Sequence, residues 1–322
     1  MIYKEALENN IFNHICSCAD ELGLECYVIG GFVRDYIIKK STPKDIDIVV
    51  VGDGVNFANH VSSKLKNTPH VTVFKTYGTA MFKYNDVEIE FVGARKESYS
   101  LESRNPKVST GSLEDDQNRR DFTINSMAFS LNKANYGALV DPFNGLEDIQ
   151  NKIIRTPLDP EITYNDDPLR MLRAIRFATK LDFKINDESL SSILSLSSRI
   201  EIITKERIII ELNKILLTDK PSKGFILLDK CGLLKYILPE ITSLKGIDEI
   251  EGQTHKDNFY HTLEVLDNIC KHTDDLWLRW AALLHDIGKA PTKRFSKKIG
   301  WTFHGHEFEG SKMVYHLFKR IK

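Results

Sequence analysis

Two aspartates separated by one residue stand in the segment 44–49 (KDIDIV). The apolar residues around them predict a strand, and alternate residues of a strand face the same side. Both carboxylates, Asp45 and Asp47, would then point together while Ile46 and Ile48 enter a core. Adjacent carboxylates repel one another unless a cation lies between them, and their oxygens suit Mg²⁺. The pair predicts a metal site for phosphoryl or nucleotidyl transfer. The alternative is a solvated face of an edge strand.

A double glycine, Gly30-Gly31, separates a β-branched run at 27–29 from a predicted helix at 32–40. Glycines at such a turn let the backbone approach a phosphate closely, and the helix N-terminus adds partial positive charge. Arg34, early in that helix, could meet a triphosphate. A tight turn would need the same glycines, so the signal comes from the whole order: strand, double glycine, helix with arginine, strand with paired aspartates.

A third candidate segment, residues 165–178 (NDDPLRMLRAIRFA), begins with an N-cap residue, acidic side chains and an early proline, which predict a helix. Arg170, Arg173 and Arg176 recur every three residues on one broad face. Asp167 lies one turn before Arg170. A carboxylate beside a guanidinium offers an acceptor next to donors, which matches the edges of cytosine and adenine and mismatches uracil and guanine. An ordinary i,i+3 salt bridge is the alternative.

The segment 28–51 resembles the nucleotidyltransferase head of class II tRNA CCA-adding enzymes and bacterial poly(A) polymerases, and the resemblance continues through the chain. Residues 119–127 (RRDFTINSM) match the second motif of the family, and residues 141–145 (DPFNG) match the turn between head and neck. The helix at 165–178 matches the family's Glu-Asp-x-x-Arg motif, with Asp166 in place of the glutamate. The resemblance implies an α/β head with a mixed sheet, an all-α neck and body, and a partial helical HD domain.

The resemblance also implies roles for individual residues. Asp45 and Asp47 would be catalytic and hold Mg²⁺. A further set would bind the incoming nucleotide: Gly31, Arg34, Arg120, Asp167, Arg170, Arg173 and Arg176. Within the segment 119–127, two arginines at the start of a helix could bind phosphates or a ribose, or could simply pair with Asp115 and Asp116. Glu90, on a predicted strand at 87–92, could support the metal or be an ordinary exposed glutamate, and its role stays open.

The implied reaction adds C, C and A to the 3′ end of tRNA from CTP and ATP without a nucleic-acid template. Poly(A) synthesis, or addition of C or A alone, remains an alternative because the heads of these enzymes look alike. In relatives the segment 97–111 controls the switch to ATP; its polar composition predicts a mobile loop here. An HD phosphohydrolase with a degenerate head and a non-enzymatic RNA-binding module are further alternatives.

The last part of the chain carries histidines at positions that resemble HD-type metal-dependent phosphohydrolases. His261 precedes an apolar helical run, and His285-Asp286 follows another. Imidazoles with a carboxylate suit a transition metal that activates water. His304 and His306 are further candidate ligands. The aspartate that ends the family's pattern is not found before Lys322, so we expect a truncated HD domain and a chain that could be the front part of a longer polypeptide; a purely structural HD fold is the alternative.

Composition sets the wider frame. The 322 residues are 42% hydrophobic and 28% charged, with a formal net charge of −1. A nucleic-acid site must therefore be a local basic patch. The five cysteines form no CxxC pair, which with the absence of an apolar leader or span predicts a cytoplasmic protein with no membrane partner. We expect tRNA, and not DNA, as the nucleic acid. The pattern predicts a head at 1–150, an RNA-binding neck and body at 151–245, and an HD domain at 246–322.

Overall fold

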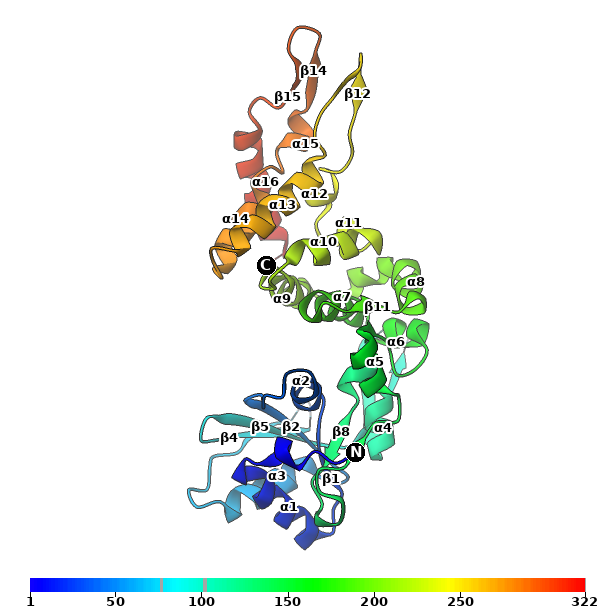
Figure 1. Ribbon diagram of the computed structural model, residues 1–322, viewed down its shortest axis with the longest axis vertical. Helices are drawn as coiled ribbons and strands as arrows, with labels where there is room; N and C mark the ends of the chain where they lie inside the picture. The colour runs from blue at the N-terminus through cyan, green and yellow to red at the C-terminus, as the bar shows by residue number, and fades with distance from the viewer. Residues whose placement is uncertain (76–77, 101–102, 322) are drawn as a thin grey trace. The chain divides into compact units, whose positions relative to one another are not determined.

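The computed structural model describes residues 1–75, 78–100 and 103–321. Contacts divide the chain into two compact units, Met1–Asp166 and Asp167–Lys322 (Figure 1). Among the described residues, no helix combines the length and the apolar character that crossing a bilayer requires. The predicted fold class, a mixed sheet with helices followed by an all-helical region, is confirmed.

The first unit is built around a mixed sheet. In its described residues seven strands lie in the order β3-β4-β5-β2-β1-β8-β9. Only β2 and β5 among these neighbours run parallel. The strands predicted at 27–29, 44–49 and 87–92 are confirmed as β1, β2 and β5. The strand bounds are β1 Cys26–Ile29, β2 Asp45–Val50, β3 Thr72–Phe74, β4 Thr79–Tyr84, β5 Val87–Gly93, β8 Ala128–Ser130 and β9 Leu139–Val140.

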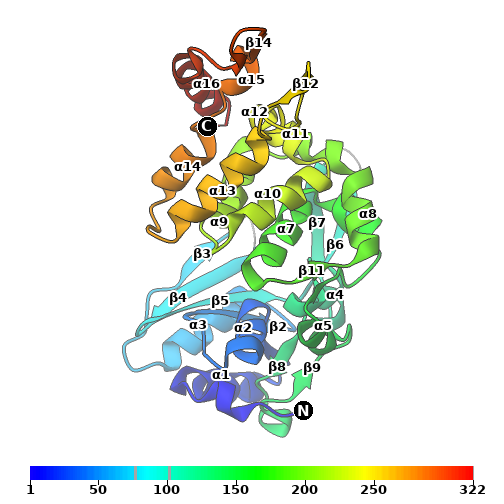
Figure 2. The same ribbon diagram turned by 45° about the horizontal axis from the view of Figure 1, so that its top comes forward.

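Three helices supply the main core of this unit: α1 Asn10–Leu22, α2 Gly31–Lys39 and α3 Gly54–Lys64. They lie with the sheet in the lower part of Figure 2. Ile46 and Ile48 of β2 are buried in one cluster with apolar side chains of all three helices. Since successive strand residues alternate, Asp45 and Asp47 lie on the opposite face, where they stay exposed.

The polar segment at 97–111 differs from the expectation. Strands β6 Arg95–Ser100 and β7 Ser103–Thr110 pair antiparallel as a hairpin (Figure 2), and only Leu101 and Glu102 of the predicted loop lie outside the described residues. The loop prediction was wrong, because the two segments pair with one another through their backbones. Hydrophobic alternation therefore gave no signal.

The hairpin is followed by α4 Leu113–Asn118, and the unit also contains α5 Gly145–Asn151, β10 Ile153–Ile154 and α6 Pro160–Asp166. Helix α4 starts with a capping box between Ser112 and Asp115 and ends before Arg119. The two arginines at 119 and 120 therefore follow a helix and do not begin one, which corrects that expectation. The capping box fixes the start of α4 at Ser112. The helix has ended when the chain reaches the two arginines.

The second unit is helical. Its helices are α7 Leu169–Leu181, α8 Asp187–Ser195, α9 Lys205–Leu216, α10 Pro221–Lys230, α11 Leu234–Ile237, α12 Pro239–Thr242, α13 Asn258–Cys270, α14 Leu276–Leu284, α15 Lys289–Thr292 and α16 His306–Ile321. Its short strands are β11 Lys184–Ile185, β12 Glu249–Ile250, β13 Gln253–Thr254, β14 Arg294–Ser296 and β15 Gly300–Thr302. The helix predicted within 165–178 forms as α7. Leu172 of α7 and Leu212 of α9 are fully buried in this unit.

Candidate active site

The carboxylates lie on one face of the first unit's sheet. In the parallel pair β2 and β5, Asp45 is in register with Glu88 and Asp47 with Glu90. Paired residues of neighbouring strands point to the same side, so Glu90 stands beside Asp47 on the face away from the helical core. On its other side Glu90 is in register with Met81 of β4, whereas Glu88 is in register with Lys83. The sequence does not decide whether Glu90 belongs to the site. The strand register places it beside Asp47, in one acidic group with Asp45 and Asp47.

The surroundings of Asp47 raise its pKa. Asp47 is exposed, but neighbouring protein atoms remove water from its carboxylate. This desolvation is the largest cause of the raised pKa. The negative charges of Glu90, Asp45 and Asp116 raise the pKa further, while the guanidinium of Arg120 opposes them. A group of carboxylates held in mutual repulsion fits a hard divalent cation such as Mg²⁺. The residues present therefore fit the metal that the resemblance implies.

The double glycine brings the backbone close to this acidic group. Gly30 has φ +79°, and a Cβ at this position would stand 3.0 Å from Nη1 of Arg120 and 3.6 Å from Oδ2 of Asp47. The turn therefore needs glycine for both conformation and space. Arg34, in the first turn of α2, is buried and donates from Nη1 to Oδ1 of Asn125 at 2.6 Å and from Nε to Asp35 at 2.7 Å. The structure thus brings Gly30 and Arg120 to Asp47.

Asp116 anchors the two arginines that follow α4. Its carboxylate is fully buried; Nε of Arg119 donates to Oδ1 at 2.9 Å, while Nε and Nη2 of Arg120 donate to Oδ2 at 3.1 and 3.0 Å. Burial alone would raise the pKa of Asp116, but the charges of Arg120 and Arg119 outweigh it and hold the pKa below its usual value. The predicted ion pair with Asp116 is confirmed, whereas Asp115 caps α4.

In the second unit, α7 carries the predicted base-reading pair. Asp167 accepts a hydrogen bond from the Leu169 amide at 3.1 Å, so its carboxylate helps to begin the helix, and both Asp167 and Arg170 are partly exposed. Arg173 is partly exposed as well. Arg176 is buried, with Nε 2.6 Å from Oε2 of Glu211 on α9. The arginines therefore differ: two remain accessible, and the third is held inside the helical unit.

The histidine region forms a compact cluster. His261, His285 and Asp286 are the one set of three or more metal-ligating side chains, within the described ranges, whose donor atoms all lie within 4.8 Å of one another. Nδ1 of His285 donates to the Ala282 carbonyl at 2.8 Å, and Nε2 lies 3.1 Å from Oδ2 of the buried Asp286. His306 approaches the other oxygen, Oδ1, at 3.7 Å. Two nitrogens and a carboxylate oxygen fit a transition metal.

Two residues of the first unit, Asn125 and Asp116, belong to the site but are not indicated as site residues by the sequence. Asn125 accepts from Arg34 through its side chain and from Nη1 of Arg120 through its carbonyl at 3.3 Å. The sequence indicates Asp116 only as an ion-pair partner of the arginines, yet the structure places it fully buried. Both stand in or next to the motif at 119–127, which could have drawn attention to them, but burial and contacts of this kind are not readable from a single sequence.

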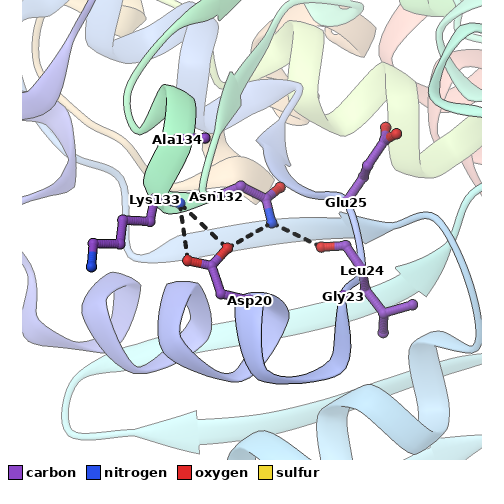
Figure 3. Close-up of a pocket in the computed structure, with 7 residues that line it drawn as sticks. All are labelled: Asp20, Gly23, Leu24, Glu25, Asn132, Lys133 and Ala134. Atoms are coloured by element: carbon purple, nitrogen blue, oxygen red, sulfur yellow. Dashed lines mark hydrogen bonds between the residues drawn. The ribbon is translucent and has the colours of Figure 1, made fainter.

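A hollow of about 700 Å³ in the first unit contains none of the candidate residues. It lies between the end of α1 and the segment after β8, where Asn132 donates to the Leu24 carbonyl at 2.8 Å and to Asp20 at 3.2 Å (Figure 3). The side-chain oxygen Oδ1 of Asn132 also accepts from the Cys26 amide at 3.0 Å. These bonds tie β1 to the chain after β8, so we read this hollow as structural.

Comparisons with known proteins agree with this architecture. Family models match in order along the chain: the poly A polymerase head domain at residues 26–155, the probable RNA and SrmB-binding site of polymerase A at 182–245, and the HD domain at 258–322. A multifunctional CCA protein from Pseudomonas fluorescens (strain Pf0-1) is 34% identical over 315 residues, which cover 93% of this chain and 71% of that protein.

Two further relatives add detail. An A-adding tRNA nucleotidyltransferase from Aquifex aeolicus (strain VF5) is 42% identical over 163 residues, 51% of this chain and only 19% of that protein. A solved structure of a tRNA nucleotidyltransferase complexed with a primer tRNA and an incoming ATP analogue has a TM-score of 0.65 and 27% identity, and the match covers 95% of this chain and 83% of that one. The ordered motifs, the acidic sheet face and these matches together show that the chain belongs to the CCA-adding tRNA nucleotidyltransferases, a family of nucleotidyltransferase enzymes.

Proposed function

We propose that this chain adds C, C and A to the 3′ end of tRNA, using CTP and ATP and no nucleic-acid template. The observation that carries the proposal is the face of the sheet on which Asp45, Asp47 and Glu90 stand together, next to the double-glycine turn. The similarity of a multifunctional CCA protein to 93% of this chain also supports the proposal. Nucleotidyl transfer in this family depends on a divalent metal ion, and we propose Mg²⁺.

In the proposed mechanism Asp45 and Asp47 would hold Mg²⁺ and Glu90 would support them. Bound Mg²⁺ would make the primer hydroxyl a better nucleophile and neutralise the charge that develops on the phosphates. Gly30 leaves room for Arg120 beside Asp47, and Gly31 starts α2, whose first amides face the turn. We propose that Gly31, Arg34 and Arg120 position the triphosphate, so that the α-phosphate meets the 3′ hydroxyl.

Base selection is proposed for α7. Asp167 supplies an acceptor and Arg170 donors, which together suit cytosine and adenine. The Asp167 carboxylate has one oxygen bonded to the Leu169 amide, which fixes its direction. Arg173 and Arg176 would hold the triphosphate. The ion pair with Glu211 and the packing of the Arg176 guanidinium 4.0 Å from the Phe177 ring centre support a fixed orientation for that side chain.

We propose three functional parts: a head at 1–150, an RNA-binding neck and body at 151–245, and an HD domain at 246–322. The order of the three family models supports this division.

We propose that the protein works in the cytoplasm, where tRNA, CTP and ATP are present together. A second activity, hydrolysis of a phosphate ester with a transition metal, is favoured by one observation: the convergence of His261, His285 and Asp286.

The test offers the purified protein a tRNA that ends before CCA, with each nucleotide alone and with both. We expect two C residues with CTP alone and a complete CCA end with CTP and ATP. Asp47→Asn should abolish incorporation without lowering the melting temperature, because it removes one of several repelling charges. Long A tails on a generic RNA would favour poly(A) synthesis. Activity that survives Asp47→Asn but is lost in His285→Ala would overturn the proposal in favour of a phosphohydrolase.

A further inference from the structure

We propose that Asn125 is a positioning residue for nucleotide binding, because it holds both Arg34 and Arg120 beside the double-glycine turn. This role rests on the proposed function, in which the two arginines contact the triphosphate. Asn125 would act on the nucleotide only through them. All of these groups lie in the first unit.

Asn125 holds Arg34 through its side chain. Nη1 of Arg34 donates to Oδ1 of Asn125 at 2.6 Å, and both side chains are buried. A hydrogen bond from a charged group is stronger than a neutral one, and its loss here would leave a desolvated guanidinium without this partner. Nε of Arg34 donates to Asp35 at 2.7 Å. The third nitrogen, Nη2, would stand 3.7 Å from a Cβ at Gly31.

Asn125 holds Arg120 through its main chain. Nη1 of Arg120 donates to the Asn125 carbonyl oxygen at 3.3 Å, and the same nitrogen would stand 3.0 Å from a Cβ at Gly30. Nε and Nη2 of Arg120 donate to Asp116 at 3.1 and 3.0 Å. Arg34 and Arg120 are therefore held alike. A carboxylate binds one part of each guanidinium, and Asn125 binds another part next to the turn.

Asp121 fixes the orientation of the Asn125 amide. Nδ2 of Asn125 donates to Oδ1 of the buried Asp121 at 2.9 Å, and that oxygen also accepts from the Phe122 amide at 2.9 Å. A guanidinium can only donate, and an ionised carboxylate can only accept. The amide oxygen must therefore face Arg34 while the amide nitrogen faces Asp121. Asparagine meets both requirements with one short side chain.

Backbone hydrogen bonds place Asn125 beside the double-glycine turn. Asn125 ends the short 3-10 helix η2, Thr123–Asn125, and its amide donates to the Phe122 carbonyl at 2.9 Å. Two residues later, the Met127 carbonyl accepts from the Gly30 amide at 3.2 Å. A Cβ at Gly30 would stand 3.7 Å from the Asn125 carbonyl oxygen. The turn and the residue that holds both arginines are therefore joined by main-chain bonds.

The consequence is a preference for nucleotides that have a full triphosphate. Phosphates carry the negative charge that the two guanidinium groups attract. A guanidinium that is already fixed loses little conformational freedom when a phosphate binds to it. Without the Asn125 side chain, Arg34 would have to be ordered by the nucleotide itself. Binding of a triphosphate should then weaken, while binding of a monophosphate should change little.

The test compares Asn125→Ala with the wild type in the affinities for CTP, CDP and CMP, measured by calorimetry with Mg²⁺ and without RNA. This variant removes the contact to Arg34 and keeps the main-chain contact to Arg120. We expect CTP affinity to fall by about tenfold, as for one lost hydrogen bond to a charged group, and CMP affinity by less than about twofold, with CDP in between. In tRNA extension, KM for CTP should rise by a larger factor than kcat falls.

A double-mutant cycle shows whether Asn125 acts through Arg34. Lysine at position 34 keeps the charge but lacks the planar fork of donors, so Asn125→Ala should add little to the loss of CTP affinity in Arg34→Lys. Asn132→Ala is the matched control, since Asn132 also bridges two segments of this unit, with bonds to Leu24 and Cys26. It should lower the melting temperature, leave the ratio of CTP to CMP affinity unchanged, and combine multiplicatively with Arg34→Lys.

Melting curves identify any variant that does not fold. If Asn125→Ala is such a variant, Asn125→Asp replaces it, because its charge repels Asp121 and neutralises Arg34 and should also lower the ratio of CTP to CMP affinity. Equal losses of CTP and CMP affinity, or multiplicative effects in the cycle with Arg34→Lys, would overturn the inference. A wild type whose preference for CTP depends on Asn125 but that extends no tRNA would refute the proposed function and leave the role of Asn125 standing.

Discussion

Glu90→Gln should have opposite effects on metal binding and on the stability of the metal-free protein. In the structure Glu90 is in register with Asp47 on one side and with Met81 on the other, so its negative charge adds to an acidic group. Two unit charges about 5 Å apart, the spacing of neighbouring strands, repel by about 0.8 kcal/mol in water. Removing the Glu90 charge should therefore stabilise the metal-free protein by about 0.5–1 kcal/mol.

The same change should weaken the metal site. Loss of a residue that supports metal ligands typically costs about 10–100-fold in metal affinity, which corresponds to about 1.4–2.7 kcal/mol. We expect the Mg²⁺ concentration for half-maximal incorporation to rise by that factor, while incorporation at saturating Mg²⁺ stays well above that of Asp47→Asn. Removing a negative charge should also lower the pKa of Asp47, so the acid limb of kcat/KM should move to lower pH.

The assays are a magnesium titration of single-nucleotide incorporation and urea unfolding in the presence of a chelator. Glu88→Gln is the matched control, since Glu88 stands two residues earlier on the same strand and has Lys83 across from it. We expect a smaller change in the magnesium requirement for this control. An unchanged magnesium requirement in Glu90→Gln would refute the assignment of Glu90 to the site, and a loss of stability without metal would show that Glu90 is structural.

Three further predictions follow from the geometry. Gly30→Ala should destabilise the first unit by about 1–3 kcal/mol and reduce incorporation, because φ is +79° and the new Cβ would press on Arg120, whereas Gly31→Ala should keep the wild-type urea midpoint. Arg279→Met should lower the free energy of unfolding by about 3–5 kcal/mol, since this buried guanidinium donates to three backbone carbonyls, and a cost within experimental error would contradict its role. The lowered pKa of Asp116 means that its ionised form stabilises the fold above the ordinary aspartate pKa and that this contribution is lost as pH falls through the lower, folded pKa. Melting temperature should therefore fall less steeply in acid for Asp116→Asn than for the wild type, and parallel curves would refute the ion-pair assignment.

The positions that the sequence could assign are those where local pattern decides the outcome. The alternation around Asp45 and Asp47 placed both carboxylates on one face of a strand, and that strand forms as β2. The capping and spacing signals at 165–178 gave helix α7 within a few residues. In these segments the spacing of apolar and polar side chains and the capping signals come from residues close together in the chain. A single sequence is therefore enough to predict which face of the element each residue takes.

The hairpin at β6 and β7 shows where that approach fails. Its strands are polar and pair with one another through backbone hydrogen bonds. Such pairing leaves no apolar alternation, and composition alone indicates a loop. The ion pair between Glu97 and Arg119, 3.4 Å apart, could not be predicted either, because it depends on where the base of the hairpin lies.

Tertiary structure alone decided which distant groups meet. Glu90 joins Asp47 because β2 and β5 pair in parallel with a fixed register, and the two residues are far apart along the chain. Asp116 is buried and holds both Arg119 and Arg120. His261 lies near Asp286 because α13 packs against α14. Local periodicity specifies which face a residue takes on its own element, whereas contact between elements depends on strand register and helix packing over the whole unit.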